Sequence, residues 1–206
     1  MTDGMRLFLL IIGGYLLGSI PTAYLVGRAH GGIDIREHGT KNMGASNTHM
    51  VLGVFNGALV LIIDVAKGTA AVFLGRWLTP DVLWAPYAAG TLAVIGHIYP
   101  VFAGFRGGKG AATIAGFALG IHYLLGLGVL GIFSVVGFII NSLAVSSMLG
   151  FAFFPIVVLV GAAPWPAVAW TIVAAGLCIY RHWPNLQKFL RGEEIPFRSG
   201  LMRKHD

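Results

Sequence analysis

The sequence predicts an all-α polytopic membrane protein with about seven transmembrane helices, organised as a single domain over residues 1–206. Two observations support this fold class. Hydrophobic residues make up 56% of the chain and charged residues only 11%, far from the composition of soluble proteins. Several stretches also exceed about 18 mostly apolar residues, the length that crosses the hydrocarbon of a bilayer. We therefore expect the lipid bilayer to be a partner of the chain, and its net charge of +6 suits anionic headgroups.

The apolar pattern divides into segments separated by polar or turn-forming residues. We expect seven spans, at Leu7–Val26, Val51–Leu74, Trp84–Phe102, Ala111–Leu124, Gly126–Ile140, Met148–Val160 and Pro166–Tyr180. The first is interpreted as a retained helix, because it is too long for a signal-peptide core and no small-residue cleavage site follows it. The fourth to sixth are short, so some of them are expected to be tilted, kinked or incomplete spans.

Three polar stretches interrupt this pattern, at Arg28–His49, Gly104–Gly110 and Arg181–Asp206. They contain eleven of the fourteen Lys and Arg residues, and with seven spans they all fall on the same side. Because cytoplasmic loops of membrane proteins carry an excess of Lys and Arg, we expect these stretches and the C-terminus in the cytoplasm and the N-terminus outside.

The second polar stretch, Gly104–Gly110, is a glycine-rich turn with apolar sequence on both sides. Backbone N–H groups exposed by glycines, together with a lysine, are a common way to hold phosphate, so Gly107, Gly108, Gly110 and Lys109 are candidate phosphate-binding residues. The alternative is a tight interfacial turn whose cations only fix the topology. The spacing is not that of a Walker A loop, which has Ser or Thr after the Lys, and this argues against a nucleotide triphosphatase.

The first polar stretch is dense in glycine and small hydrogen-bonding residues. Such a loop can fold back and line a polar cavity with hydroxyl, amide and N–H groups, which makes four of its residues candidates for binding substrate: Asn42, Gly44, Ser46 and Asn47. The alternative is an ordinary solvated loop rich in turn formers.

Three ionisable residues lie inside apolar segments. Asp64 and Lys67 are one helical turn apart, and His97 is near the predicted cytoplasmic end of its span. Charges inside a membrane cost about 2.5–3.5 kcal/mol each, so they usually pair or face a wet cavity. Asp64 and Lys67 therefore either border the site or form a structural pair, and His97 is interpreted as a structural histidine.

The third polar stretch directly follows the last span. If it is helical, His182 and Asn185 share a face, where His can order or deprotonate a hydroxyl and Asn can hold it. Pro184 favours a position in the first turn of a new helix. The alternative is a basic amphipathic tail on the membrane surface.

Taken together, these motifs resemble the bacterial acyl-phosphate:glycerol-3-phosphate acyltransferase family. The resemblance covers nearly the whole chain and rests on four stretches in order: Gly18–Thr22, Arg36–Asn47, Gly104–Thr113, and Arg181-His182 with Asn185 and Glu194. It implies an enzyme of the bacterial inner membrane, with its active site facing the cytoplasm. That enzyme moves a fatty acyl group from acyl phosphate to the first hydroxyl of glycerol 3-phosphate, giving lysophosphatidic acid.

The resemblance also implies roles for individual residues. It assigns catalysis to Thr40, Lys109, His182 and Asn185, and a structural carboxylate to Glu194. It implies no metal, nucleotide or other cofactor and no nucleic-acid partner. The expected partners are acyl phosphate, glycerol 3-phosphate and an enzyme that supplies acyl phosphate. Because acyl phosphate is already activated, positioning and charge neutralisation suffice for the transfer.

The chain departs from the family pattern at three positions. Thr40 stands where the family has Ser, Lys41 stands where it has Gly, and Met50 replaces an important Arg. Met50 can neither hydrogen-bond nor neutralise phosphate. Two alternatives therefore stay open: a divergent paralogue that uses another acceptor, or a transporter or lipid-binding protein without chemistry. A transporter typically shows inverted repeats, which this sequence does not.

Overall fold

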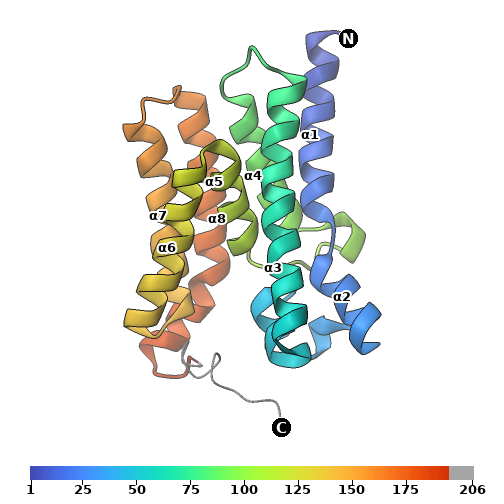
Figure 1. Ribbon diagram of the computed structural model, residues 1–206, viewed down its shortest axis with the longest axis vertical. Coiled ribbons are helices and arrows are strands. Elements are labelled where there is room, and N and C mark those ends of the chain that lie inside the picture. Colours follow the sequence, from blue (N-terminus) through green and yellow to red (C-terminus); the bar gives the residue numbers. More distant parts are fainter. Residues whose placement is uncertain (195–206) are drawn as a thin grey trace.

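The computed structural model describes residues 1–194, and within that range it is all-helical and contains no strand. Its α-helices are α1 (Asp3–Ser19), α2 (Thr22–Gly31), α3 (Ala45–Leu78), α4 (Ala85–Ile98), α5 (Ala111–Ile121), α6 (Tyr123–Ile140), α7 (Leu143–Val160) and α8 (Trp165–Leu190). There are also two single 3-10 turns: η1 (Ile35–Glu37) lies in the first polar stretch, and η2 (Val101–Ala103) directly precedes the second. Figure 1 shows the helices in this order, and the predicted all-α class is confirmed.

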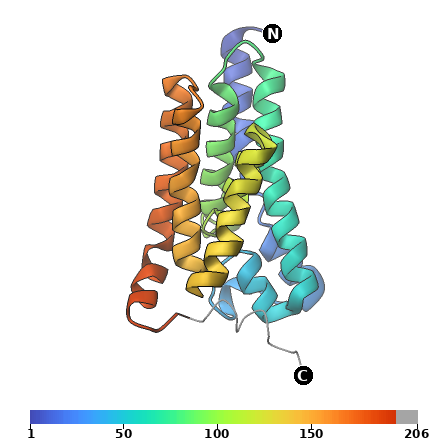
Figure 2. The same cartoon turned by 60° about the vertical axis from the view of Figure 1, so that its left-hand side comes forward.

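The longer helices run along the long axis of the molecule in both views (Figures 1 and 2). By length and composition, four segments of the described chain can each cross a membrane: Asp3–Gly31, Ala45–Leu78, Tyr123–Ile140 and Leu143–Val160. Many of their apolar side chains are exposed, for example Phe55 at 73% and Val160 at 80%. Apolar surface of this extent requires a lipid environment, as expected of an integral membrane protein.

The first apolar segment is not the single helix that the sequence predicted. The helix α1 ends at Ser19, and α2 begins at Thr22. Pro21 has no N–H to donate and disfavours the helical conformation at the residue before it, so Ile20 takes a ψ of 114° and the helix stops. The short α2 then turns aside at the end of the bundle away from the N-terminus (Figure 1).

The helix α3 begins earlier than predicted, at Ala45 instead of Val51, and contains a kink. Gly53 interrupts the helical conformation with a φ of 84° and a ψ of 175°. The turns before Gly53 therefore form a separate short helix at the level of the polar loops. Asn47 and Met50 lie on this short helix and not in a loop.

The helix α8 extends well past the predicted end at Tyr180 and passes through Pro184 without a break. The expectation that Pro184 starts a new helix is therefore wrong. Pro184 removes one backbone hydrogen bond, to the carbonyl of Tyr180. Both residues are exposed, so the lost bond is not buried in the core and the helix tolerates it.

The helices pack as two groups, α1, α3 and α4 on one side and α6, α7 and α8 on the other, with α5 between them (Figures 1 and 2). A close approach joins α5 to α3, because a Cβ at Gly116 would overlap the backbone of Val65. On its other side, Phe117 of α5 meets Phe154 of α7 edge to face, with ring centroids 4.8 Å apart. This packing fixes the start of α5, which directly follows the glycine-rich stretch.

Candidate active site

The three polar stretches meet at the end of the bundle away from the N-terminus, where α2, the start of α3 and the end of α8 lie (Figure 1). Arg36 of the first stretch donates from Nη1 to the carbonyl of Ala103, at 3.0 Å. Arg181 of the third stretch donates from Nη2 to the carbonyl of Gly108 in the glycine-rich stretch, at 3.3 Å. Arg181 therefore holds the second stretch itself and Arg36 holds the residue directly before it, so the grouping expected from the sequence is present in space.

The glycine-rich stretch, called here the glycine loop (residues 104–110), is packed too closely for side chains at its centre. The N–H of Gly108 donates to the carbonyl of His97 at 3.1 Å. A Cβ at Gly108 would contact the Met43 carbonyl at 2.5 Å and overlap the imidazole of His97. Only glycine fits this position, which lies between the first polar stretch and α4.

The loop ends at the N-terminus of α5. Gly110 has a φ of +87°, which favours glycine, and its carbonyl accepts the first hydrogen bond of the helix, from Ile114 N at 2.8 Å. The first N–H groups of a helix have no partner within it and carry the positive end of the helix dipole. Lys109 thus lies where backbone N–H groups already favour an anion.

Lys109 and Asn185 form the contact between the second and third stretches. Lys109 Nζ donates to Asn185 Oδ1 at 2.5 Å. Burial, and then the positive charges of Arg181 and Lys188, lower the pKa of Lys109 to about 8. A half-buried ammonium beside other positive charges favours an anion such as phosphate, whose charge would offset theirs.

His182 lies one turn before Asn185 on α8 and is buried. Its Nδ1 is 2.8 Å from the carbonyl of Cys178, and its ring meets that of Phe151 at a centroid distance of 5.1 Å. A carbonyl only accepts, so Nδ1 carries a proton, and Nε2 of the neutral ring is left as an acceptor. This orientation suits a group that accepts a hydrogen bond from a hydroxyl.

Asn47 organises the first polar stretch. Its side-chain Nδ2 donates to the carbonyls of Ile35 and His38, at 3.1 and 3.0 Å, and its Oδ1 accepts from Thr40 N at 2.7 Å. Both amide hydrogens are therefore used within the loop. These bonds let Asn47 hold Thr40 in position. The direct contact of Asn47 with substrate that the sequence suggested stays a prediction.

The remaining predicted residues of this stretch differ in exposure. Thr40 and Ser46 are exposed, Asn42 is half-buried and Gly44 is buried. Lys41 is exposed and has a φ of 59°, a left-handed conformation that costs a side chain such as lysine about 1–2 kcal/mol. Met50, half-buried in the first turns of α3, lies on the same helical segment as Asn47.

An acid–base clamp in the first stretch was not singled out from the sequence. Asp34 accepts from the guanidinium of Arg36, with Nη2 at 2.7 Å, and from the N–H of Arg36 at 3.0 Å. The bonds from Arg36 lower the pKa of Asp34 to about 2. The pattern Asp-x-Arg is too short to predict this arrangement. Its structural role depends on the hydrogen bond from Arg36 to the carbonyl of Ala103, which is distant in sequence.

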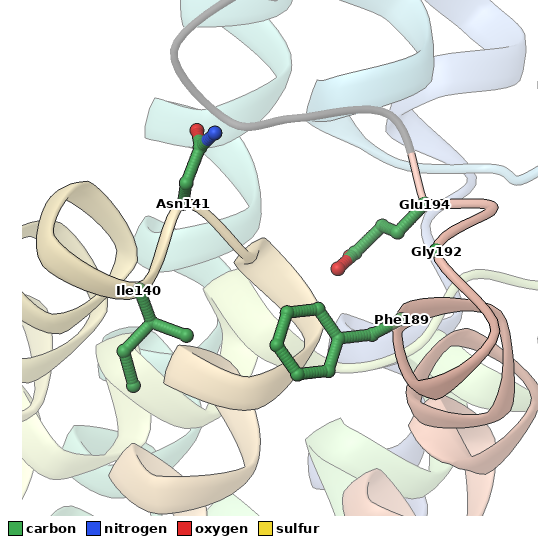
Figure 3. Close-up of a pocket in the computed structure, with 5 residues that line it drawn as sticks. All are labelled: Ile140, Asn141, Phe189, Gly192 and Glu194. Atoms are coloured by element: carbon green, nitrogen blue, oxygen red, sulfur yellow. The ribbon is translucent and has the colours of Figure 1, made fainter.

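A pocket of about 200 Å³ lies between the end of α8 and the turn between α6 and α7 (Figure 3). It is lined by Ile140, Asn141, Phe189, Gly192 and Glu194. Phe189 is one turn of α8 beyond Asn185, so the pocket begins next to the candidate site and does not contain it. Figure 3 shows the Glu194 carboxylate pointing from the end of α8 toward the turn between α6 and α7.

Glu194 joins the end of the described chain to the start of α7. Its Oε2 accepts from Ser142 Oγ at 2.5 Å, and its Oε1 accepts from Ala144 N at 3.2 Å. Ser142 also caps α7 by accepting from Val145 N at 3.1 Å. A carboxylate at a helix N-terminus is favoured by the unpaired N–H groups there. Among residues 1–194, no group of three or more His, Cys, Asp or Glu side chains is arranged to hold a metal ion.

The chain is similar over nearly its whole length to known acyltransferases. The family model for glycerol-3-phosphate acyltransferase matches residues 8–192. A glycerol-3-phosphate acyltransferase of Thermosynechococcus vestitus is 37% identical, covering 94% of this chain and 96% of that protein. Glycerol-3-phosphate acyltransferase 2 of Moorella thermoacetica is 41% identical, covering 90% and 95%.

The fold is also that of a solved membrane enzyme. The crystal structure of PlsY, an integral membrane glycerol 3-phosphate acyltransferase, in its glycerol 3-phosphate form superposes with a TM-score of 0.88 at 29% identity, covering 96% of this chain and 99% of that one. The lysophosphatidic acid form of the same enzyme gives a TM-score of 0.86 at 28% identity. The sequence and the fold agree, and the chain belongs to the glycerol-3-phosphate acyltransferase family.

Proposed function

We propose that this acyltransferase moves a fatty acyl group from acyl phosphate to the first hydroxyl of glycerol 3-phosphate and releases lysophosphatidic acid and inorganic phosphate. One observation carries the proposal: the ammonium of Lys109 and the amide of Asn185 meet at 2.5 Å beside the start of α5. A cation, a neutral hydrogen-bonding group and free backbone N–H groups converge there from separate parts of the chain. That combination suits a phosphate and a hydroxyl held side by side.

In the proposed reaction, the hydroxyl oxygen attacks the acyl carbon, and the bond from that carbon to the phosphate oxygen breaks. Lys109 and the backbone N–H groups of Gly107 and Gly110 hold the phosphate and neutralise its charge as it leaves. Gly108 shapes the loop, because its own N–H is bonded to the carbonyl of His97. Asn185 holds the hydroxyl, and His182 Nε2 accepts its proton. No covalent intermediate on the enzyme is required, because the donor is already activated and the two substrates need only be held together.

The first polar stretch is proposed to bind the acceptor. The Thr40 hydroxyl takes the place of the family's serine, and Asn42, Gly44 and Ser46 supply further polar contacts. Support comes from the hydrogen bond between Asn47 and Thr40 N, which fixes Thr40, and from the packing of the Met43 carbonyl against Gly108. The acceptor would therefore lie next to the phosphate-binding loop.

We further propose one domain with seven membrane crossings in the bacterial inner membrane, with the N-terminus outside and the site and C-terminus in the cytoplasm. Helix α2 does not count as a crossing, because it turns aside at the polar end of the bundle, whereas the similarly short α5 is packed between the two groups of long helices (Figure 1). The concentration of Lys and Arg at one end of the bundle supports this orientation. Acyl phosphate then reaches the site from a separate enzyme that makes it.

The test is an assay of the purified chain in lipid nanodiscs with acyl phosphate and labelled glycerol 3-phosphate. We expect labelled lysophosphatidic acid, and a loss of turnover of about 10²- to 10⁴-fold in His182→Ala, the scale of a general base. His122→Ala is the matched control, because His122 lies at the exposed turn between α5 and α6. A folded wild-type protein that makes no product with glycerol 3-phosphate would favour the paralogue or the non-catalytic alternative.

A further inference from the structure

Three ionisable side chains are buried together behind the glycine loop. Asp64 and Lys67 of α3 are 1% and 4% exposed, and His97 of α4 is 6% exposed. Asp64 Oδ1 is 2.9 Å from Lys67 Nζ and 3.7 Å from His97 Nδ1. One carboxylate oxygen thus lies between a lysine and a histidine from two different helices. This arrangement is larger than the pair that the spacing of Asp64 and Lys67 suggests.

The outer members of this group, Lys67 and His97, each contact backbone outside a regular helix. Lys67 Nζ donates to the carbonyl of Ile20 at 3.1 Å, where the break between α1 and α2 exposes that carbonyl. At the other end, the imidazole of His97 lies directly against Gly108, since a Cβ there would overlap His97 Nε2. The carbonyl of His97 also accepts from Gly108 N at 3.1 Å. The network therefore connects a helix break to the centre of the loop.

We propose that Asp64, Lys67 and His97 are positioning residues that set the conformation of the glycine loop for phosphate. The inference rests on the proposed phosphate site at Lys109. Lys67 fixes the carboxylate of Asp64, and that carboxylate lies against the Nδ1 side of the His97 imidazole at 3.7 Å, an electrostatic contact without a direct hydrogen bond. The ring and the carbonyl of His97 then fix Gly108. Lys109 is the next residue, so a shift of Gly108 moves the ammonium and the N–H groups that receive the phosphate.

The competing explanation is that Asp64 and Lys67 only balance each other's charge. Removing one member of a buried pair leaves an uncompensated charge, so single substitutions destabilise the protein under either explanation. Removing both charges is often tolerated, because no charge is then left unpaired. The double variant Asp64→Asn, Lys67→Met therefore separates the two: charge balance is preserved in it, but the contact that orients His97 is weakened.

The experiment compares the double variant and His97→Gln with the wild type as full-length chains in nanodiscs. The affinity for inorganic phosphate is measured by calorimetry, and KM and kcat are measured with acyl phosphate and glycerol 3-phosphate. We expect phosphate binding to weaken by about 10- to 100-fold in both, since misplacement by about 1 Å has effects on the order of 10²-fold. Adding His97→Gln to the double variant should weaken phosphate binding little further, because all three substitutions act through the same contact with Gly108.

Thr79→Val is the matched control for the loss of a buried polar group in α3. Thr79, the C-cap of α3, is buried, and its Oγ1 donates to the carbonyl of Gly75 at 2.8 Å. It lies at the end of α3 that is away from the polar stretches. Phosphate affinity should be unchanged in it even if its melting temperature falls. The positioning role would be overturned if the folded double variant and His97→Gln had the same phosphate affinity and the same KM as the wild type.

The phosphate measurement separates this inference from the proposed reaction. If the wild type binds phosphate but makes no lysophosphatidic acid, the proposed reaction fails, and the comparison of the variants still decides the role of the network. If the wild type is active but the variants match it, the network inference fails alone. A wild type that neither binds phosphate nor makes lysophosphatidic acid would overturn both.

Discussion

Lys109 has an unusual environment for a surface lysine. It is half-buried, it donates to Asn185, and the positive charges of Arg181 and Lys188 near it outweigh the negative charge of Glu194. A free ammonium in this position is poorly compensated, which explains why its pKa is lowered to about 8. In the proposed function, a bound phosphate supplies compensating charge. The feature that weakens the charged form of Lys109 is therefore expected to strengthen phosphate binding.

The first prediction follows from that pKa. As the pH rises from 7 to 9, Lys109 passes through its pKa of about 8 and loses its proton, so competitive inhibition by inorganic phosphate should weaken by about 10-fold. Lys109→Arg keeps its charge over this range and should remove the dependence. Phosphate itself also titrates in this range, but it does so equally for both proteins. The ratio of their inhibition constants therefore reports on Lys109 alone. Lys109→Ala should weaken inhibition at pH 7 by about 1.5–3 kcal/mol. Equal pH profiles for wild type and Lys109→Arg would contradict the assignment.

Met50 stands where the family has an arginine, on the short first part of α3. An arginine there would give a bidentate contact to an acceptor phosphate that neither Met nor Lys can copy. The second prediction is that Met50→Arg lowers the KM for glycerol 3-phosphate by about 10-fold, the scale of a charge-assisted hydrogen bond. Met50→Lys, which adds the charge without the fork, is the matched control.

Lys41 bears on the same question. If Lys41 supplies the cation that Met50 cannot, Lys41→Gly should abolish activity, and adding Met50→Arg should restore it. If Lys41 only occupies a loop position, Lys41→Gly should keep activity and stabilise the fold by about 1 kcal/mol, because glycine accepts the φ of 59° without strain. Unchanged acceptor KM in Met50→Arg would place the acceptor phosphate away from this helix.

At the scale of elements, the start of α7 and the end of α8 are joined through one carboxylate. Glu194 binds both Ser142 and Ala144 N. This contact closes the α7–α8 pair at the end where His182 and Asn185 lie, and it borders the pocket in Figure 3. We therefore expect Glu194 to hold the last turns of α8 in register with α7.

The third prediction tests this join. Glu194→Ala should lower the free energy of unfolding by about 1–2 kcal/mol, the range for a partly exposed hydrogen-bonded carboxylate, and should lower turnover. Glu193→Ala, an exposed neighbour, should do neither. Thermal unfolding in nanodiscs and the acyl-transfer assay are the measurements. A Glu194→Ala protein as stable and as active as Glu193→Ala would show that the contact is dispensable.

The elements also show where the sequence was informative. Long apolar runs predicted the positions of α4 to α7 closely, because hydrocarbon imposes both length and composition on a helix that crosses it. The break at Pro21 was missed because the apolar pattern continues across it. The extension of α8 was missed because beyond Tyr180 the helix leaves the apolar region and has no hydrophobic signal.

The candidate site was predictable in composition and not in geometry. Glycines beside a lysine, and a histidine three residues before an asparagine, indicate their chemistry from local sequence alone. These residues could therefore be identified without the fold. Which of them touch depends on helix packing: the Lys109–Asn185 contact joins residues 76 positions apart. The internal role of Asn47 was hidden for the same reason, because its partners are carbonyls, which every residue has.

At the scale of the whole molecule, the two ends of the bundle differ in chemistry. The end that contains the site collects the glycine loop, the Asp34–Arg36 clamp and the last turns of α8. The other end contains the N-terminus and the short turns between α3 and α4 and between α7 and α8 (Figure 1). A molecule with one cationic polar end and an apolar flank has a preferred orientation in a membrane whose cytoplasmic side retains Lys and Arg.

The last prediction is the topology that follows. Single cysteines at Lys41 and Lys188, both exposed, should be unreactive toward a membrane-impermeant maleimide on intact cells and should react after the inner membrane is permeabilised. A cysteine at Thr2 should react in intact cells. The native Cys178 is fully buried, so it contributes little background and need not be removed. Labelling of Lys41→Cys or Lys188→Cys from outside would reverse the proposed orientation, and opposite results at these two positions would mean that the three polar stretches do not share one side of the membrane.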